Sequence, residues 1–303
     1  MERPGEFELI ARHFAPIAGP GGLGLVDDAG LLRPARGYEI VVTADTLVAG
    51  VHFFPDDPPG SIARKALAVN LSDLAAKGAK PEGFVLALAL PKGWTESWLA
   101  AFATGLKQAA DAGGCPLIGG DTVSTPGPLT LSITAFGSVP AGRMVLRSGA
   151  KPGDMLAVSG TIGDGALGLK VHGPAAPSWV AGLSEGHRAA LTERFLHPQP
   201  RLRLAAGLQA HASAAMDVSD GLVGDLAKLL KASGAAELAW TGGDDYEILC
   251  TASQGEYPAL AAAAAAAGIA LTAIGVVTGA TGAVQYREKG RARRFATGSF
   301  AHF

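Results

Sequence analysis

The 303-residue sequence has few cysteines, few charged residues and no long apolar run. Its two cysteines, Cys115 and Cys250, lie far apart without a CxxC pair or a histidine cluster, which argues against a disulfide framework and against a zinc site. We expect both to be buried, reduced thiols. No apolar run approaches the roughly 20 residues that cross a bilayer, and residues 1–12 lack the apolar core of a signal peptide. These absences predict a soluble, cytoplasmic protein with no membrane partner.

Positive charge is not in excess, because 25 Lys and Arg residues are balanced by 27 Asp and Glu residues, a formal net charge of −2. This balance argues against a nucleic-acid partner, since nucleic-acid-binding domains are usually basic. Hydrophobic residues make up 48% of the chain, which is enough for a sizeable core. A single core stops growing near about 250–300 residues, so we expect two domains.

Helix-like and strand-like segments alternate in both halves of the chain. Predicted helices span 1–14, 61–78, 95–112, 163–171, 187–195, 201–210, 222–231 and 257–267, and predicted strands span 38–43, 84–90, 116–118, 129–139, 155–159, 248–251 and 270–277. The character of the sequence changes near Pro140, so we place the domains at 1–140 and 141–303. The alternation predicts an α/β (α+β) fold with mixed sheets covered by helices in each domain.

The most informative residues are aspartates that stand beside small or apolar residues rather than on charged helix faces. They are Asp27, Asp28, Asp45, Asp73, Asp121, Asp217, Asp220, Asp244 and Asp245. Several are expected at the ends of strands or just before a helix. An ionised carboxylate in buried surroundings is costly without a partner, and no matching set of basic residues stands near these positions. A divalent cation is therefore the expected partner, and oxygen-only ligands favour Mg²⁺ over zinc.

Other interpretations of these aspartates stay open at this point. A single Asp before a helix is usually an N-cap, and an Asp beside Gly is often a turn residue. Calcium binding without catalysis would also use carboxylates, although EF-hand spacing is absent. Composition alone leaves a metal site and these structural roles about equally supported.

Phosphate binding is suggested by two turn-rich segments. Arg147 and Lys151 lie in one Gly-containing turn, and residues 160–165 open a predicted helix, where backbone N–H groups attract phosphate. Tight packing is the favoured interpretation of the second segment, with ligand contact as the alternative. The GxxxxGK[ST] motif is absent, and so is the protein-kinase motif set, which excludes those two classes of phosphotransferase.

An ordered series of motifs covers nearly the whole chain. They are GEFELI at 5–10, DDA at 27–29, TADTLVAGVHF at 43–53, KALAVNLSDLAA at 65–76, GGDT at 119–122, RSGAKPGD at 147–154, DVSDGL at 217–222 and GGDDYE at 242–247. Together they resemble the thiamine-monophosphate kinase family, within the larger group that includes aminoimidazole ribonucleotide synthetase. The resemblance implies the two-domain fold of that group, with an N-terminal ATP- and Mg²⁺-binding domain that also forms a homodimer.

The resemblance also implies the site residues and the reaction. The implied Mg²⁺ ligands are Asp28, Thr43, Asp45, Asp73, Asp121, Asp217 and Asp220; the implied ATP contacts are Gly120, Asp121, Arg147 and Ser219; the implied contacts to thiamine monophosphate are His52, Asp244 and Phe300. The expected reaction is phosphorylation of thiamine monophosphate to thiamine diphosphate by direct in-line transfer from ATP. No residue is assigned a catalytic role, because a phosphomonoester with a second pKa of about 6 is already largely ionised at pH 7.

Two departures from the family pattern leave alternatives open. Val26 stands where relatives have Gly before the Asp pair, so this turn is expected to differ. Only residues 232–241 connect the helix after the DVSDGL motif to the GGDDYE motif, where relatives have a longer segment. The alternatives are a related ATP-dependent enzyme with a different small substrate, and a nucleotide-binding protein without turnover.

Overall fold

The computed structural model describes residues 5–234, 244–278, 286–288 and 291–293. Its elements in chain order are α1 Glu6–Leu9, η1 Ile10–Phe14, η2 Ala15–Ile17, η3 Pro20–Leu25, β1 Tyr38–Val48, α2 Pro59–Ala76, β2 Lys80–Pro91, α3 Glu96–Gly113, β3 Leu117–Thr125, β4 Thr130–Pro140, β5 Met155–Ser159, α4 Asp164–His172, η4 Ser178–Gly182, α5 Glu185–Leu196, η5 Leu202–Leu204, α6 Ala205–His211, β6 Ala214–Val218, α7 Leu222–Ala232, β7 Glu247–Ala252, α8 Tyr257–Ala266, β8 Leu271–Val276, β9 Tyr286–Glu288 and β10 Arg291–Arg293. None of the helices among these described residues is both long and apolar enough to cross a membrane.

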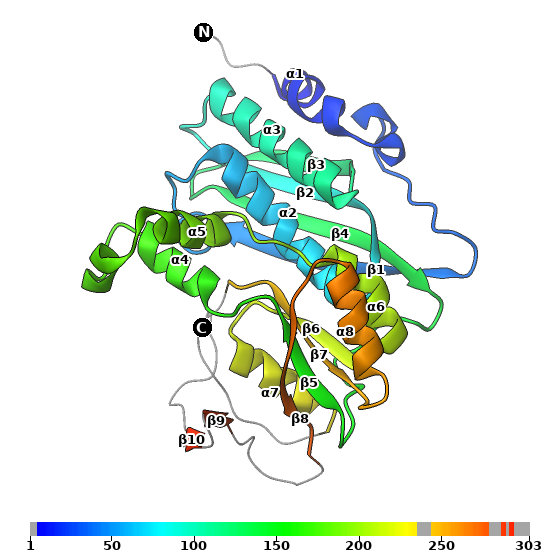
Figure 1. Cartoon of the computed structure of the whole chain (residues 1–303). Coiled ribbons are helices and arrows are strands. Elements are labelled where there is room, and N and C mark those ends of the chain that lie inside the picture. The colour runs from blue at the N-terminus through cyan, green and yellow to red at the C-terminus, as the bar shows by residue number, and fades with distance from the viewer. Residues whose placement is uncertain (1–4, 235–243, 279–285, 289–290, 294–303) are drawn as a thin grey trace. The chain divides into compact units, whose positions relative to one another are not determined.

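The chain divides into two compact units (Figure 1). Unit 1 comprises Met1–Leu74 and Lys80–Gly142, and unit 2 comprises Ala75–Ala79 and Arg143–Phe303. The end of α2 and the short segment that follows it thus belong to unit 2, which a single cut in the sequence near residue 140 does not anticipate. The roles given to domains 1–140 and 141–303 stay predictions.

Unit 1 is built on a four-stranded sheet in the order β1-β4-β2-β3, in which only β2 and β3 run parallel. Helices α2 and α3 lie on one face of this sheet (Figure 1). Leu67 of α2, Leu106 of α3 and Leu131 of β4 are fully buried in this core. Alternate side chains of a strand point to opposite faces, so each strand contributes every second residue to it.

The other face of this sheet, called the open face below, carries exposed apolar side chains. Tyr38 and Val42 on β1 are 45% and 57% exposed, and Val123 on β3 is 49% exposed. Their neighbours in the alternation, such as Val41 and Leu47, are buried on the helix-covered face. The open face therefore presents exposed apolar side chains on both of its edge strands.

Unit 2 is an antiparallel sheet in the order β6-β7-β5-β8 with helices on both faces (Figure 1). On one face Leu229 of α7 belongs to the same apolar cluster as Met216 of β6. On the other face Leu208 of α6 and Leu260 of α8 belong to the cluster of Ile248 of β7. Helices α4 and α5 pack against each other beside this sheet.

Several element boundaries differ from those expected from the sequence. Asp45 and Asp121 lie inside β1 and β3 rather than after them, because both strands continue beyond their apolar portions. Helix α2 begins at Pro59, two residues before the expected start at residue 61. Asp217 belongs to the strand β6, which was not expected. Helix α3, expected at 95–112, spans Glu96–Gly113, and Thr95 Oγ1 caps it by accepting a hydrogen bond from Trp98 N–H at 3.1 Å.

Candidate active site

Three of the predicted metal ligands lie on the helix-covered face of unit 1. Thr43 and Asp45 are two residues apart on β1, so their side chains point to the same face of the sheet. The Thr43 hydroxyl donates a 2.5 Å hydrogen bond to Asp73 Oδ2 on α2, which shows that this face is the one that α2 covers. The arrangement presents two carboxylates and one hydroxyl from adjacent elements, and these are oxygen donors of the kind that Mg²⁺ prefers.

Asp121 lies at the opposite edge of the same sheet. Strands β1 and β3 are its two edges, so Asp45 and Asp121 are three strand spacings apart, or about 14 Å. The pairing register carries Asp45 across the sheet to Gly120, so the next residue, Asp121, points to the open face. One sheet therefore does not bring Asp121 together with Thr43, Asp45 and Asp73.

The backbone at Gly120 explains why the residue before Asp121 is glycine. A Cβ atom there would lie 2.0 Å from the carbonyl oxygen of Leu86 on β2. No side chain fits in that space, because real Cβ contacts do not approach so closely. The close approach of β2 and β3 thus depends on this glycine.

The loop that carries Asp28 is exposed. The backbone N–H of Asp28 donates a hydrogen bond to Asp27 Oδ1 at 2.8 Å. Val26, at the position where a glycine was expected, has φ −111, which any residue adopts. The left-handed residues of this segment are instead Leu23, Gly24 and Leu25. A side chain at position 26 is therefore compatible with this turn.

His52 lies in the turn that follows β1. Its Nδ1 accepts a 3.0 Å hydrogen bond from the backbone N–H of Val48. An accepting Nδ1 carries no proton, so the neutral ring has its proton on Nε2.

In unit 2 the predicted ligands lie where β6 meets α7. Asp217 is in β6 and is 5% exposed, and Asp220 follows in the connecting loop. The sequence-based expectation that no basic residue stands near these carboxylates is wrong for Asp220. Lys228 of α7 donates to Asp220 Oδ2 at 2.5 Å and to Asp225 Oδ1 at 2.8 Å. The eight-residue separation in sequence hides this ion pair.

Asp225 was not singled out from the sequence, yet it organises this loop. Its Oδ2 accepts hydrogen bonds from the backbone N–H groups of Ser219 and Asp220, both at 3.0 Å. Burial raises the pKa of Asp225, and the hydrogen bond and charge of Lys228 oppose that rise. Burial acts to lower the pKa of Lys228, but its hydrogen bonds to Asp220 and Asp225 and their charges raise it overall. Lys228 therefore stays charged beside them.

Asp244 is held directly against the same loop. Its backbone N–H donates to the Ser219 carbonyl at 2.8 Å, and the N–H of Tyr246 donates to the Val218 carbonyl at 2.8 Å. Asp244 and Tyr246 have φ values of 66 and 51, which non-glycine residues rarely adopt. The predicted substrate residue Asp244 and the predicted nucleotide residue Ser219 are thus adjacent in the fold.

The segment 160–165, a candidate for phosphate binding, is already bound by a carboxylate of the same chain. Asp245 accepts hydrogen bonds from the N–H groups of Gly163 and Gly165 at distances from 2.9 to 3.1 Å. A Cβ atom at Gly165 would lie 2.0 Å from the carbonyl oxygen of Asp244. The tight-packing interpretation of this segment is therefore the better one, because the N–H groups of Gly163 and Gly165 at the start of α4 are occupied.

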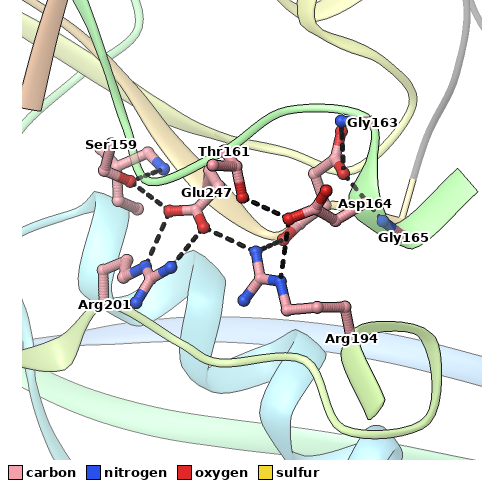
Figure 2. Close-up of polar contacts among 10 residues, drawn as sticks. Ser159, Thr161, Gly163, Asp164, Gly165, Arg194, Arg201 and Glu247 are labelled. Carbon is pink, nitrogen blue, oxygen red and sulfur yellow. Dashed lines mark hydrogen bonds and ion pairs between the residues drawn. The ribbon is translucent and has the colours of Figure 1, made fainter. Parts of the chain in front are cut away.

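A buried ion cluster lies next to this turn (Figure 2). Glu247, at the start of β7, is fully buried and accepts a 2.6 Å hydrogen bond from Ser159 Oγ. Arg194 of α5 and Arg201 both pair with it, and Arg201 bonds to both of its carboxylate oxygens. Arg194 also lies 3.9 Å from Asp164 at the start of α4. The cluster joins β5, β7, α4 and α5 at one point.

Arg147 lies at the far end of α7 from Ser219. Its carbonyl accepts a 2.8 Å hydrogen bond from Ser233 Oγ, directly after α7. Helix α7 has 11 residues, so the backbones of Arg147 and Ser219 are separated by about 16 Å along it. Only the long side chain of Arg147 can approach the Ser219 loop. Phe300 and most of the short segment 232–241 lie outside the described residues.

Within the described part of the chain, no three His, Cys, Asp or Glu side chains converge on one point that could hold a metal ion. The seven predicted ligands divide between the units, with Asp217 and Asp220 in unit 2 and the others in unit 1. Both cysteines are free and buried, as expected. Burial raises the pKa of each thiol to about 12, so neither is a reactive thiolate.

Comparison with known proteins decides the family. The family described as AIR synthase related protein, N-terminal domain, matches residues 26–139. The thiamine-monophosphate kinase of Caulobacter vibrioides is 41% identical over an alignment that covers 95% of this chain and 88% of that protein. The chain belongs to the thiamine-monophosphate kinase family. The family predicted from the motifs is thereby confirmed.

Solved structures of this family confirm the fold. Thiamine-monophosphate kinase from Stenotrophomonas maltophilia K279a matches with a TM-score of 0.77 at 39% identity, covering 86% of this chain and 89% of that one. A structure described as AaThiL complexed with AMPPCP and TMP matches with a TM-score of 0.74 at 26% identity, covering 100% of this chain and 99% of that one.

Proposed function

We propose that this chain transfers the γ-phosphoryl group of ATP to the phosphate of thiamine monophosphate, giving thiamine diphosphate and ADP. The observation that carries the proposal is the 41% identity over 95% of the chain to a thiamine-monophosphate kinase. A relative similar along the whole chain was solved with AMPPCP, an analogue of ATP, and TMP. Those ligands supply the donor and acceptor classes that we propose here.

The acceptor needs no general base. Its phosphate, with a second pKa of about 6, is mostly a dianion at pH 7. One of its oxygens forms a bond to the γ-phosphorus of ATP, while the bond from that phosphorus to the β,γ-bridging oxygen breaks and ADP leaves. The main barrier is the approach of two anions. Mg²⁺ would reduce their repulsion and fix the in-line geometry, as phosphoryl transfer requires.

The oxygen donors of unit 1 fit this metal. Asp45 and Asp73, with the Thr43 hydroxyl hydrogen-bonded to Asp73, form the group that we propose binds Mg²⁺ in unit 1. Asp28 and Asp121 are further proposed ligands. A metal on Asp121 needs its other ligands from outside the Thr43, Asp45 and Asp73 group, since Asp121 points to the open face. In unit 2 the proposed ligands are Asp217 and Asp220, and Lys228 donates a hydrogen bond to Asp220 Oδ2.

The contacts to the two substrates are also proposed from the family resemblance. We propose that Gly120, Asp121, Arg147 and Ser219 contact ATP and that His52, Asp244 and Phe300 contact thiamine monophosphate. The backbone bond between Asp244 and Ser219 supports this assignment in unit 2, because one loop pair then carries a contact to each substrate. The Nε2–H of His52 is a suitable donor to an acceptor oxygen.

A homodimer is also part of this proposal. The open face of unit 1, with Tyr38, Val42 and Val123, offers an apolar surface for a second copy of the chain.

The location in the cytoplasm stays a prediction.

The experiment that tests the reaction uses ATP made chiral at the γ-phosphorus with oxygen isotopes. The expected product is thiamine diphosphate with inverted configuration at that phosphorus, because direct transfer is a single displacement. Retention would show a phosphorylated enzyme and contradict direct transfer. Phosphorylation of thiamine in preference to its monophosphate would contradict the acceptor.

A further inference from the structure

Asp245 binds backbone that lies directly under a predicted substrate contact. Its side chain is 2% exposed, and its carboxylate accepts hydrogen bonds from Gly163 and Gly165. Gly165 in turn touches Asp244, because no Cβ atom fits between Gly165 and the Asp244 carbonyl. Asp245 directly follows Asp244 in the chain, so its hydrogen bonds fix the backbone beside Asp244.

The conformation at this position requires such an anchor. Asp244 and Tyr246, on either side of Asp245, both have positive φ values. Left-handed backbone costs an L-residue roughly 1–2 kcal/mol, and it persists only where the surroundings hold it. On one side the hydrogen bonds to Ser219 and Val218 hold the segment, and on the other side the Asp245 carboxylate does.

A second buried aspartate does the same for the neighbouring loop and provides a matched comparison. Asp225 is fully buried, and its carboxylate accepts the N–H groups of Ser219 and Asp220 at the start of α7. Each aspartate thus binds two backbone N–H groups at the beginning of a helix. They differ in what the bound backbone carries, since Asp225 supports the nucleotide and metal loop and Asp245 supports Asp244.

The geometry points to Asp245 as a positioning residue for the phosphate acceptor, which acts through the backbone of Asp244, whereas the Ser219 loop on the nucleotide side has its own anchor in Asp225. This inference rests on the proposed function, in which Asp244 contacts thiamine monophosphate. Asp245 itself touches neither substrate, because its carboxylate is bound to Gly163 and Gly165. The Asp245 carboxylate accepts from backbone N–H groups, whereas the neighbouring Glu247 has arginine partners, of which Arg194 also donates to the Asp245 carbonyl at 3.5 Å.

The test compares Asp245→Asn with Asp225→Asn in steady-state kinetics with both substrates varied. Asn keeps the shape but loses the charge that strengthens the bonds to the N–H groups. Loss of charge-assisted hydrogen bonds predicts a rise of about 10-fold in KM for thiamine monophosphate in Asp245→Asn, with KM for ATP unchanged within about 2-fold. Asp225→Asn is expected to show the opposite pattern, with the rise in KM for ATP.

A purely structural role would lower the amount of folded enzyme and would leave both KM values unchanged. That result, or an equal rise of both KM values in Asp245→Asn, would overturn the inference. If the unaltered enzyme shows no ADP release that depends on thiamine monophosphate, the proposed function fails, and the inference fails with it. The two failures are therefore distinguishable.

Gly165→Ala provides a second variant if Asp245→Asn does not fold. It removes no charge, but its Cβ atom displaces the carbonyl of Asp244. The same selective rise in KM for thiamine monophosphate is expected. Gly186→Ala is its control, because a Cβ atom at Gly186 meets nothing within 4 Å. A Gly165→Ala enzyme with both KM values unchanged would also overturn the inference.

Discussion

At the scale of single residues, unit 2 keeps several carboxylates out of water by three different means. Glu247 has two arginines, Asp225 has one lysine together with backbone N–H groups, and Asp245 has backbone N–H groups. An unpaired buried carboxylate would be costly, so each of these partners is required. The requirement was visible in the sequence as aspartates among small residues, but the identity of each partner was not.

The partners were hidden because they are distant in sequence. Arg194 and Arg201 are 53 and 46 residues from Glu247. The GGDDYE motif in the sequence therefore indicated a role for Asp244, while the roles of Asp245 and Glu247 became visible only in the folded structure. The opposite holds for Cys115 and Cys250, whose burial follows from residue type and composition alone.

Asp245 gives a pH dependence of stability. Burial raises its pKa to about 6, and the hydrogen bonds from Gly163 and Gly165 oppose that rise. The folded pKa lies above the unfolded one, so the folded state binds more protons between about pH 4 and pH 6. The contribution of the protonated Asp245 carboxyl group to the free energy of unfolding is fully present below the unfolded pKa. It is lost as the pH rises through about 6.

The corresponding experiment is urea unfolding of the unaltered protein and of Asp245→Asn at pH 7.5 and pH 5. Acidification is expected to increase the free energy of unfolding of the unaltered protein relative to the variant by about 1 kcal/mol. Other titrating groups cancel in this difference. A difference between the two proteins that is independent of pH, or that changes in the opposite direction, would show that Asp245 does not titrate in this range.

A change at Asp73 tests the proposed Mg²⁺ ligands of unit 1. In Asp73→Asn, turnover at a fixed low Mg²⁺ concentration is expected to fall more than about 100-fold, since even residues behind a metal ligand cost 10–100-fold. The Mg²⁺ concentration needed for half of the maximal rate should rise. Asp111→Asn, a change at an exposed aspartate of α3 paired with Lys107, is the control. Normal turnover of Asp73→Asn at low Mg²⁺ would remove Asp73 from the ligand set.

At the scale of elements, the close crossing of α2 and α3 depends on glycine. A Cβ atom at Gly105 of α3 would lie 2.4 Å from the backbone of Gly60 in α2. Because backbone cannot yield as a flexible side chain does, Gly105→Ala is expected to lower the free energy of unfolding by about 1–3 kcal/mol. Thermal or urea unfolding measures this change.

Gly186→Ala in α5 is the matched control for that change. This helical glycine has open space around it, and Ala is the better helix former, so a gain of about 0.5–1 kcal/mol is expected. A stability loss in Gly186→Ala similar to that in Gly105→Ala would mean that the crossing of α2 and α3 is not the cause.

The elements also show where prediction from sequence works. Helix α3 was predicted closely because Thr95 and Gly114 mark its ends, the first as an N-cap and the second in the left-handed conformation. β6 was missed because it is only five residues long and contains Asp217. Strands β1 and β3 were predicted too short, since their polar second halves are strands only through pairing with β4 and β2.

At the scale of the whole molecule, the open face of unit 1 predicts association. Val42→Glu would place a charge in an apolar interface, so the proposed dimer is expected to dissociate to a monomer in analytical ultracentrifugation. Val26→Glu is the control, because Val26 is 90% exposed in a loop outside the open face. A Val42→Glu protein with the same mass as the unaltered protein would place the interface elsewhere.

The central claim is that this chain is a kinase whose turnover depends on thiamine monophosphate. The most direct measurement is ADP release at saturating ATP and Mg²⁺, with thiamine monophosphate present and absent. We predict ADP release only in its presence, with one thiamine diphosphate formed for each ADP. Binding of ATP with Mg²⁺ but no turnover that depends on thiamine monophosphate would contradict the account and would favour a nucleotide-binding protein without turnover.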